Sequence, residues 1–122
     1  MCIETIKNEI FKSCNFSTDI EFVYEEFDGV KIEYDGKRAV IGSNSKSNLA
    51  RAFFLLAMNI TKEDKPFNLS QKRHFKTMGV GFDVSRGGVP EVEVFKGFIA
   101  KMASLGFNFL KLYMEDMFKM EK

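Results

Sequence analysis

The sequence predicts a mixed α/β fold of the α+β kind, in which a small antiparallel sheet with packed helices is followed by a βαβ unit. From Ile20 to Gly42, apolar and polar residues alternate with the period of half-buried strands. Apolar residues recur at helical spacing on both sides of that stretch. After Lys76, a strand pattern, a helix pattern and a second strand pattern follow one another with short links.

Composition and charge exclude several classes of protein. The 122 residues are 45% hydrophobic and 14% aromatic, enough for one core that removes roughly two thirds of the unfolded surface from water. The formal net charge of +1 provides no overall field to attract nucleic acid or an anionic membrane, so we expect neither as a partner. Charges interrupt the stretch from Met1 to Asn15, unlike a signal peptide or a membrane span. We therefore expect a cytoplasmic protein.

Two cysteines and one histidine limit metal and redox chemistry. Cys2 and Cys14 cannot form a disulfide framework, and a single histidine does not complete a Cys/His metal site. We predict reduced thiols and neither a metal nor another cofactor.

The first part of the chain opens with a helix and three strands. Apolar residues at helical spacing predict an amphipathic helix over residues 2–13. The strands are expected over residues 20–24, 30–34 and 39–41. Asp28-Gly29 and Asp35-Gly36 are read as tight turns, because glycine tolerates the positive φ that hairpin turns require. The sequence therefore predicts an antiparallel meander.

A second, unusually apolar helix is predicted from Leu49 to Ile60, capped by Ser45, Ser47 or Asn48 and lying across the meander. The charged stretch of residues 62–66 is a solvated connector, and residues 67–73 add one more strand. Residues 1–73 are thus expected to form a small non-catalytic α+β domain.

The second part, residues 74–122, follows a different pattern. Residues 76–85 form a strand with Val80 and Phe82 on one face and Gly79, Gly81 and Asp83 on the other. The two glycines indicate room for close packing. Pro90 is expected in the first turn of a helix that ends at Gly106, and residues 107–114 form the second strand. This is one βαβ unit, whereas a complete barrel of such units takes about 250 residues. We expect an incomplete (β/α)8 barrel and a truncated chain.

The polar face of the second strand has two interpretations. Lys111, Tyr113 and Glu115 share that face with Phe109. In a solvated sheet they are surface residues and nothing more. In a barrel, Lys111 and Asp83 form a buried pair.

The same alternatives apply at the ends of the two strands. In a barrel, Glu115-Asp116 lies at the carboxyl end of its strand, where barrel active sites lie. Arg86 follows the first strand, and its planar guanidinium can bind two neighbouring hydroxyls or a carboxylate, or pair with Asp83 or Asp116.

Two motifs resemble the start of the catalytic barrel in glycoside hydrolase family 20, which contains the β-N-acetylhexosaminidases: MGVGFDVSRGGVP at residues 78–90 and LGFNFLKLYMED at residues 105–116. The resemblance is closest to bacterial members and covers residues 75–118. Residues 1–73 agree only in size and order with the small α/β domain that precedes the barrel. By this resemblance, Arg86 binds ring hydroxyls of the terminal sugar, and Glu115 with Asp116 lies at the pocket rim. The structural residues near the pocket are Asp83, Lys111 and Tyr113.

The resemblance implies hydrolysis of terminal N-acetylhexosamine residues, with the acetamido oxygen of the substrate attacking the anomeric carbon. In the family, an adjacent Asp-Glu pair on a later strand protonates the leaving oxygen and orients the acetamido group. That pair is absent from this sequence, and Glu115-Asp116 matches the second strand instead. We expect the N-terminal fragment of an exo-acting β-N-acetylhexosaminidase, inactive alone, whose parent acts on terminal N-acetylhexosamine glycans.

The alternative is a stand-alone module without catalysis. It binds carbohydrate through Arg86 and nearby carboxylates, or another protein through an exposed sheet edge. A truncated barrel exposes apolar faces that later units cover, so we expect possible self-association through them. An independent module is expected to be a monomer or a defined symmetric dimer.

Overall fold

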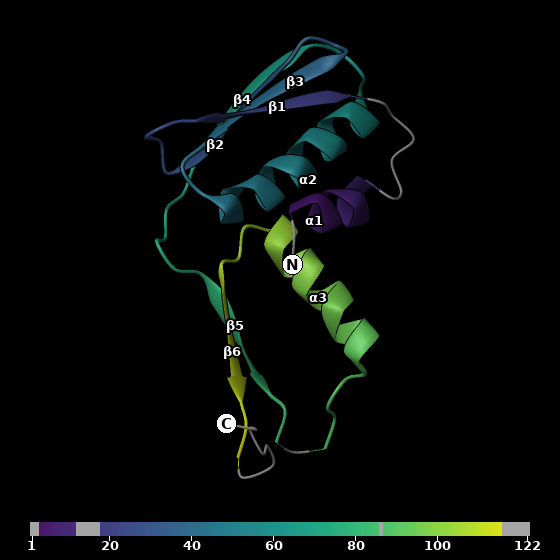
Figure 1. Cartoon of the computed structure of the whole chain (residues 1–122), viewed down its shortest axis with the longest axis vertical. Helices are drawn as coiled ribbons and strands as arrows, with labels where there is room; N and C mark the ends of the chain where they lie inside the picture. Colours follow the sequence, from purple (N-terminus) through teal and green to yellow (C-terminus); the bar gives the residue numbers. More distant parts are fainter. Residues whose placement is uncertain (1–2, 12–17, 86, 116–122) are drawn as a thin grey trace.

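The chain forms two sheets joined through helices in a computed structural model that describes residues 3–11, 18–85 and 87–115 (Figure 1). The fold is mixed α+β, as the sequence predicts. Along the chain, the described elements are α1 (Ile3–Phe11), β1 (Asp19–Tyr24), β2 (Gly29–Tyr34), β3 (Arg38–Ser43), α2 (Lys46–Lys62), β4 (Phe67–Lys72), β5 (Gly79–Asp83), α3 (Val92–Ser104) and β6 (Phe109–Tyr113).

The first sheet has the strand order β1–β3–β2–β4, so the predicted meander is wrong in one connection. β2 is antiparallel to both β3 and β4, but β1 lies outside β3 and runs parallel to it. The link after β1 passes the end of β3, where the amide of Glu25 donates to the carbonyl of Ser43 over 3.3 Å. β3 takes the inner position between β1 and β2. Its residues after Arg38 are buried or half-buried on both faces, as is typical of a central strand.

The two predicted turns differ in the structure. Gly36 has a φ of 101°, and Asp35 Oδ1 accepts the amides of Lys37 and Arg38 at 2.8 and 2.7 Å. These bonds, first from Arg38 and then from Lys37, lower the pKa of Asp35. Gly29, by contrast, has no positive φ. It is needed for close approach, because a Cβ there would lie 2.3 Å from the carbonyl oxygen of Gln71 on β4.

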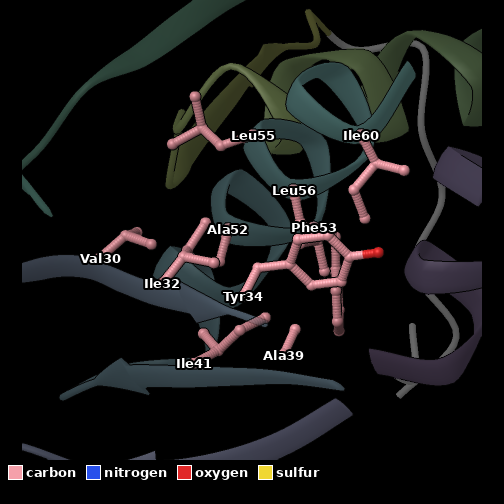
Figure 2. Packing of buried hydrophobic residues seen from close by; sticks show 10 residues of the cluster. All are labelled: Val30, Ile32, Tyr34, Ala39, Ile41, Ala52, Phe53, Leu55, Leu56 and Ile60. Atoms are coloured by element: carbon pink, nitrogen blue, oxygen red, sulfur yellow. The ribbon is translucent and has the colours of Figure 1, made fainter. Parts of the chain in front are cut away.

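The main core lies between this sheet and α2. Figure 2 shows side chains from β2 and β3, such as Ile32 and Ile41, directed toward Phe53 on α2. Phe53 is fully buried and makes edge contacts with Phe11 of α1 and Phe22 of β1, each with ring centroids 5.7 Å apart. Sheet, α1 and α3 all pack on α2, which explains why its sequence is apolar around most of its circumference.

The helix starts differ in detail from the prediction. Ser45 occupies the N-cap position of α2, but its side chain makes no capping hydrogen bond. α3 begins at Val92 with Glu91 as its N-cap, so Pro90 precedes the first turn that it was expected to occupy. None of the helices in the described ranges has the length and apolar character needed to cross a membrane.

The second sheet is the predicted βαβ unit. β5 and β6 pair in parallel, and α3 covers the face that carries Val80 and Phe82. The ring of Phe82 lies 5.4 Å from that of Phe95 and 5.8 Å from that of Phe98. Gly106, with a φ of 91°, ends the helix. The unit lies at the opposite end of the molecule from the first sheet (Figure 1).

Candidate functional site

The parallel register of β5 and β6 brings polar residues together where both strands end. Asp83 is paired with Tyr113, and Gly81 is paired with Lys111. The side chains of Asp83, Tyr113 and Lys111 therefore belong to the face that points away from α3. The amide of Val84 donates to the carbonyl of Tyr113 over 3.0 Å. The pairing therefore continues to the ends of the strands.

Side-chain hydrogen bonds hold this edge in place. Asp83 Oδ1 accepts the Ser85 amide at 2.9 Å and the Ser85 hydroxyl at 2.6 Å. On the neighbouring strand, the hydroxyl of Tyr113 donates to Glu115 Oε1 over 3.1 Å. We call these four residues, Asp83, Ser85, Tyr113 and Glu115, the carboxyl-end site. Ser85 is not among the site residues predicted from the sequence, although its position two residues after an aspartate is typical of such a turn.

The face beside this site is open. A Cβ added to Gly81 would meet nothing within 4 Å, and Lys111 across from it is exposed. Asp83 is exposed as well, so among the described residues the two do not form the buried pair that a closed barrel would require. Tyr113 keeps 48% of its surface accessible.

Two of the predicted site residues, Arg86 and Asp116, lie outside the described residues. Among the described site residues, Asp83 lies across from Tyr113, as the parallel register predicts. Glu115 is hydrogen-bonded to Tyr113. No group of His, Cys, Asp or Glu within the described ranges is arranged to hold a metal ion.

The opposite end of the strand pair is fastened by a residue that sequence reasoning did not single out. Asn108 Nδ2 donates to the carbonyl of Lys76 over 2.9 Å, and Asn108 Oδ1 accepts the amide of Met78 at 2.9 Å. Close packing at Gly79 is confirmed, because a Cβ there would lie 2.4 Å from the carbonyl oxygen of Phe109. The strands are therefore locked in register from their amino ends.

The carboxyl-end site offers acceptors and an aromatic ring to a ligand. Two carboxylates, a serine hydroxyl and a half-exposed tyrosine are groups that hydrogen-bond sugar hydroxyls and contact an apolar sugar face. Asp83 and Tyr113 belong to the strand face that points away from α3. A scan against protein-family models finds no match to the chain, and a search of curated proteins finds none.

Proposed function

We propose that the carboxyl-end site is the beginning of a sugar pocket, and that the chain is the N-terminal part of a β-N-acetylhexosaminidase like those of glycoside hydrolase family 20. In this proposal, β5, α3 and β6 are the first unit of the catalytic barrel. The observation that carries it is the pairing of Asp83 with Tyr113, which puts the ends of both parallel strands at one edge. Barrel active sites lie at the carboxyl ends of such strands.

The distribution of apolar surface supports the proposal. In a barrel, one strand face packs under the helices and the other points into the interior. The face with Val80 and Phe82 is under α3, while the other face leaves Phe109 52% accessible. On α3, Val92 and Val94 are 68% and 63% accessible. Further strands and helices on either side would bury these residues.

The proposed chemistry assigns binding rather than catalysis to this chain. Arg86 follows Ser85 directly, and its guanidinium would donate two hydrogen bonds to neighbouring ring hydroxyls of a terminal N-acetylhexosamine. Glu115 and Asp116 would form the rim, and Asp83 would fix the turn before Arg86 through its bonds to Ser85. The acid and the carboxylate that orients the acetamido group would come from an Asp-Glu pair, which this sequence lacks.

The experiment expresses the complete reading frame that contains this chain and measures release of nitrophenol from nitrophenyl N-acetyl-β-glucosaminide. Arg86→Ala is expected to lower kcat/KM by roughly 10- to 100-fold, the effect of losing a charge-assisted hydrogen-bond pair. The matched control is Arg38→Ala, which removes an exposed arginine that pairs with Glu21 on the first sheet. Its kinetics should be unchanged.

Two results would overturn the proposal. Equal kinetics for the wild type and Arg86→Ala would remove the role of Arg86. Absence of hydrolysis by the wild-type protein, together with saturable N-acetylglucosamine binding by the isolated chain, would instead identify a carbohydrate-binding module without catalysis.

A further inference from the structure

A pocket lies where the first sheet, the first half of α2 and the segment before β5 meet. Its volume is about 280 Å³, and its lining includes Val30, Arg51, Lys72, Phe75 and Met78. This volume is just below the usual range for small-molecule sites, about 300–1,000 Å³. We call it the junction pocket. It lies at the amino end of β5, so the length of the strand, about 16 Å, separates it from the carboxyl-end site.

The charged residues that line the junction pocket are basic. Arg51, Lys72 and Arg73 contribute to its lining, whereas no carboxylate does so among the described residues. Outside the lining, Asp28 Oδ1 lies 3.8 Å from Nε of Arg73. The lining itself therefore carries an excess of positive charge.

Arg73 is held in place by the structure itself. Its side chain is only 12% accessible, and its Nε donates to Asn48 Oδ1 over 3.0 Å. Together with its pairing to Asp28, this leaves Arg73 as part of the wall rather than the first contact for a ligand.

Among the described residues, Arg51 donates to two neutral acceptors. Its Nε donates to Gln71 Oε1 over 2.9 Å, and its Nη1 donates to the carbonyl oxygen of Ser104 over 3.4 Å. The ring of Phe54 lies 5.7 Å from its Cζ atom. Burial lowers the pKa of Arg51, and neither of its two hydrogen-bond acceptors carries a charge. An anion in the pocket would supply an opposite charge.

Part of the lining is apolar. Val30 is buried in the wall, while Phe75 keeps 68% of its surface accessible. Met78 completes this side of the pocket and has an adaptable, polarizable side chain. A ligand that covers the exposed ring of Phe75 would gain hydrophobic free energy that a bare inorganic ion cannot gain.

We propose that the junction pocket binds a small organic anion, whose carboxylate or phosphate pairs with Arg51 and Lys72 and whose apolar body lies against Phe75 and Met78. The proposal is independent of the carboxyl-end site and of any glycosidase activity. It assigns the join between the first sheet and the βαβ unit as a ligand site.

The test titrates the full 122-residue chain with four probes by calorimetry: benzoate, phenyl phosphate, neutral benzamide and inorganic phosphate. At least one of the two aryl anions is expected to saturate the protein, and their relative affinities tell a carboxylate site from a phosphate site. Benzamide should bind at least about tenfold more weakly than benzoate, because it lacks the charge. Inorganic phosphate should also bind more weakly than phenyl phosphate, because it lacks the apolar body.

Variants separate the pocket from nonspecific binding. Arg51→Gln and Lys72→Gln should each weaken aryl-anion binding, by about tenfold and about threefold respectively, because Arg51 is the more buried cation. Arg38→Gln removes an exposed arginine that is not part of the pocket lining, so it should have no effect. Lys72 is exposed, so its variant keeps the test valid if loss of Arg51 loosens the fold.

Three outcomes would overturn the proposal. The first is that neither aryl anion binds saturably. The second is that benzamide binds as tightly as benzoate. The third is that Lys72→Gln and Arg38→Gln have the same effect on binding.

Discussion

The guanidinium of Arg51 on α2 donates to the carbonyl oxygen of Ser104, the last residue of α3, over 3.4 Å. Ser104 is buried, and Gly106 lies beside the methylenes of Arg51. A cation at the carboxyl end of a helix also interacts favourably with the helix dipole. This contact therefore joins the helix of the first part to the helix of the βαβ unit.

Arg51→Ala is expected to lower the free energy of unfolding by about 1–2 kcal/mol, because it removes two partly exposed hydrogen bonds and the packing of the side-chain stem. Urea unfolding measures the loss. In the variant, amide hydrogen exchange should accelerate more at the last turn of α3 than in β2. Equal exchange in wild type and variant would contradict the joining role.

Gly79 and Gly81 form a matched pair on β5. Gly79→Ala should destabilise the chain by roughly 1–3 kcal/mol, because its Cβ would overlap the carbonyl of Phe109. Gly81→Ala should have little effect or stabilise by up to about 1 kcal/mol, since nothing lies within 4 Å of its Cβ. Thermal unfolding of both variants checks the register, and equal costs would contradict it.

Phe53 is the centre of the main core. Phe53→Ala is expected to cost roughly 3–5 kcal/mol, because the fully buried ring leaves a cavity between α1, α2 and β1. Met58 on the same helix is 49% accessible, so Met58→Ala should cost much less. Urea denaturation of the two variants gives the comparison. A similar loss in both would show that the ring does not centre the core.

The buried phenol of Tyr34 makes the free energy of unfolding depend on pH in the alkaline range. Burial first, and then its hydrogen bond to Asp64 over 2.8 Å, raise the pKa of Tyr34 above its ordinary value of 10.0. Its stabilising contribution is therefore fully present below pH 10.0 and is lost as the pH rises through the higher folded-state pKa. Tyr34→Phe should remove the most alkaline step of the ultraviolet phenolate titration.

A second measurement on the same variant checks the energetic side. Tyr34→Phe should lower the free energy of unfolding at neutral pH by about 0.5–1.5 kcal/mol, the usual contribution of one hydrogen bond. Loss of the absorbance change near pH 10.0, with the most alkaline step kept, would show that Tyr34 ionises like an exposed phenol.

The parts of the fold set by local pattern were predictable. Gly106 ends α3 with a positive φ, and Gly36 with Asp35 makes the turn between β2 and β3. The βαβ order after Lys76 also follows from periodicity and short links. These features depend on neighbouring residues, which a sequence displays directly.

The pairing of β1 was not predictable in the same way. Its alternating pattern says that it is a half-buried strand but not which strand is its neighbour. The Gly29 position looked like a hairpin turn, yet the glycine is required there for the close approach of Gln71. The apolar run at residues 39–41 was a stronger signal, because it matches the nearly continuous burial of β3 as an inner strand.

The carboxyl-end site was predictable from the sequence, whereas the junction pocket was not. Asp83 and Tyr113 could be placed together because parallel strands fix which residues pair. Arg51 and Phe75 could not, because the junction pocket depends on how α2 and the segment before β5 pack, and this is determined by tertiary contacts.

If β5 and β6 are the first strands of a glycosidase barrel, as proposed, the coding DNA continues beyond the codon for Lys122. Reading that DNA should reveal an open frame with continued alternation of strands and helices, and an adjacent Asp-Glu pair at the end of a later strand. A stop codon directly after Lys122 would overturn the proposal.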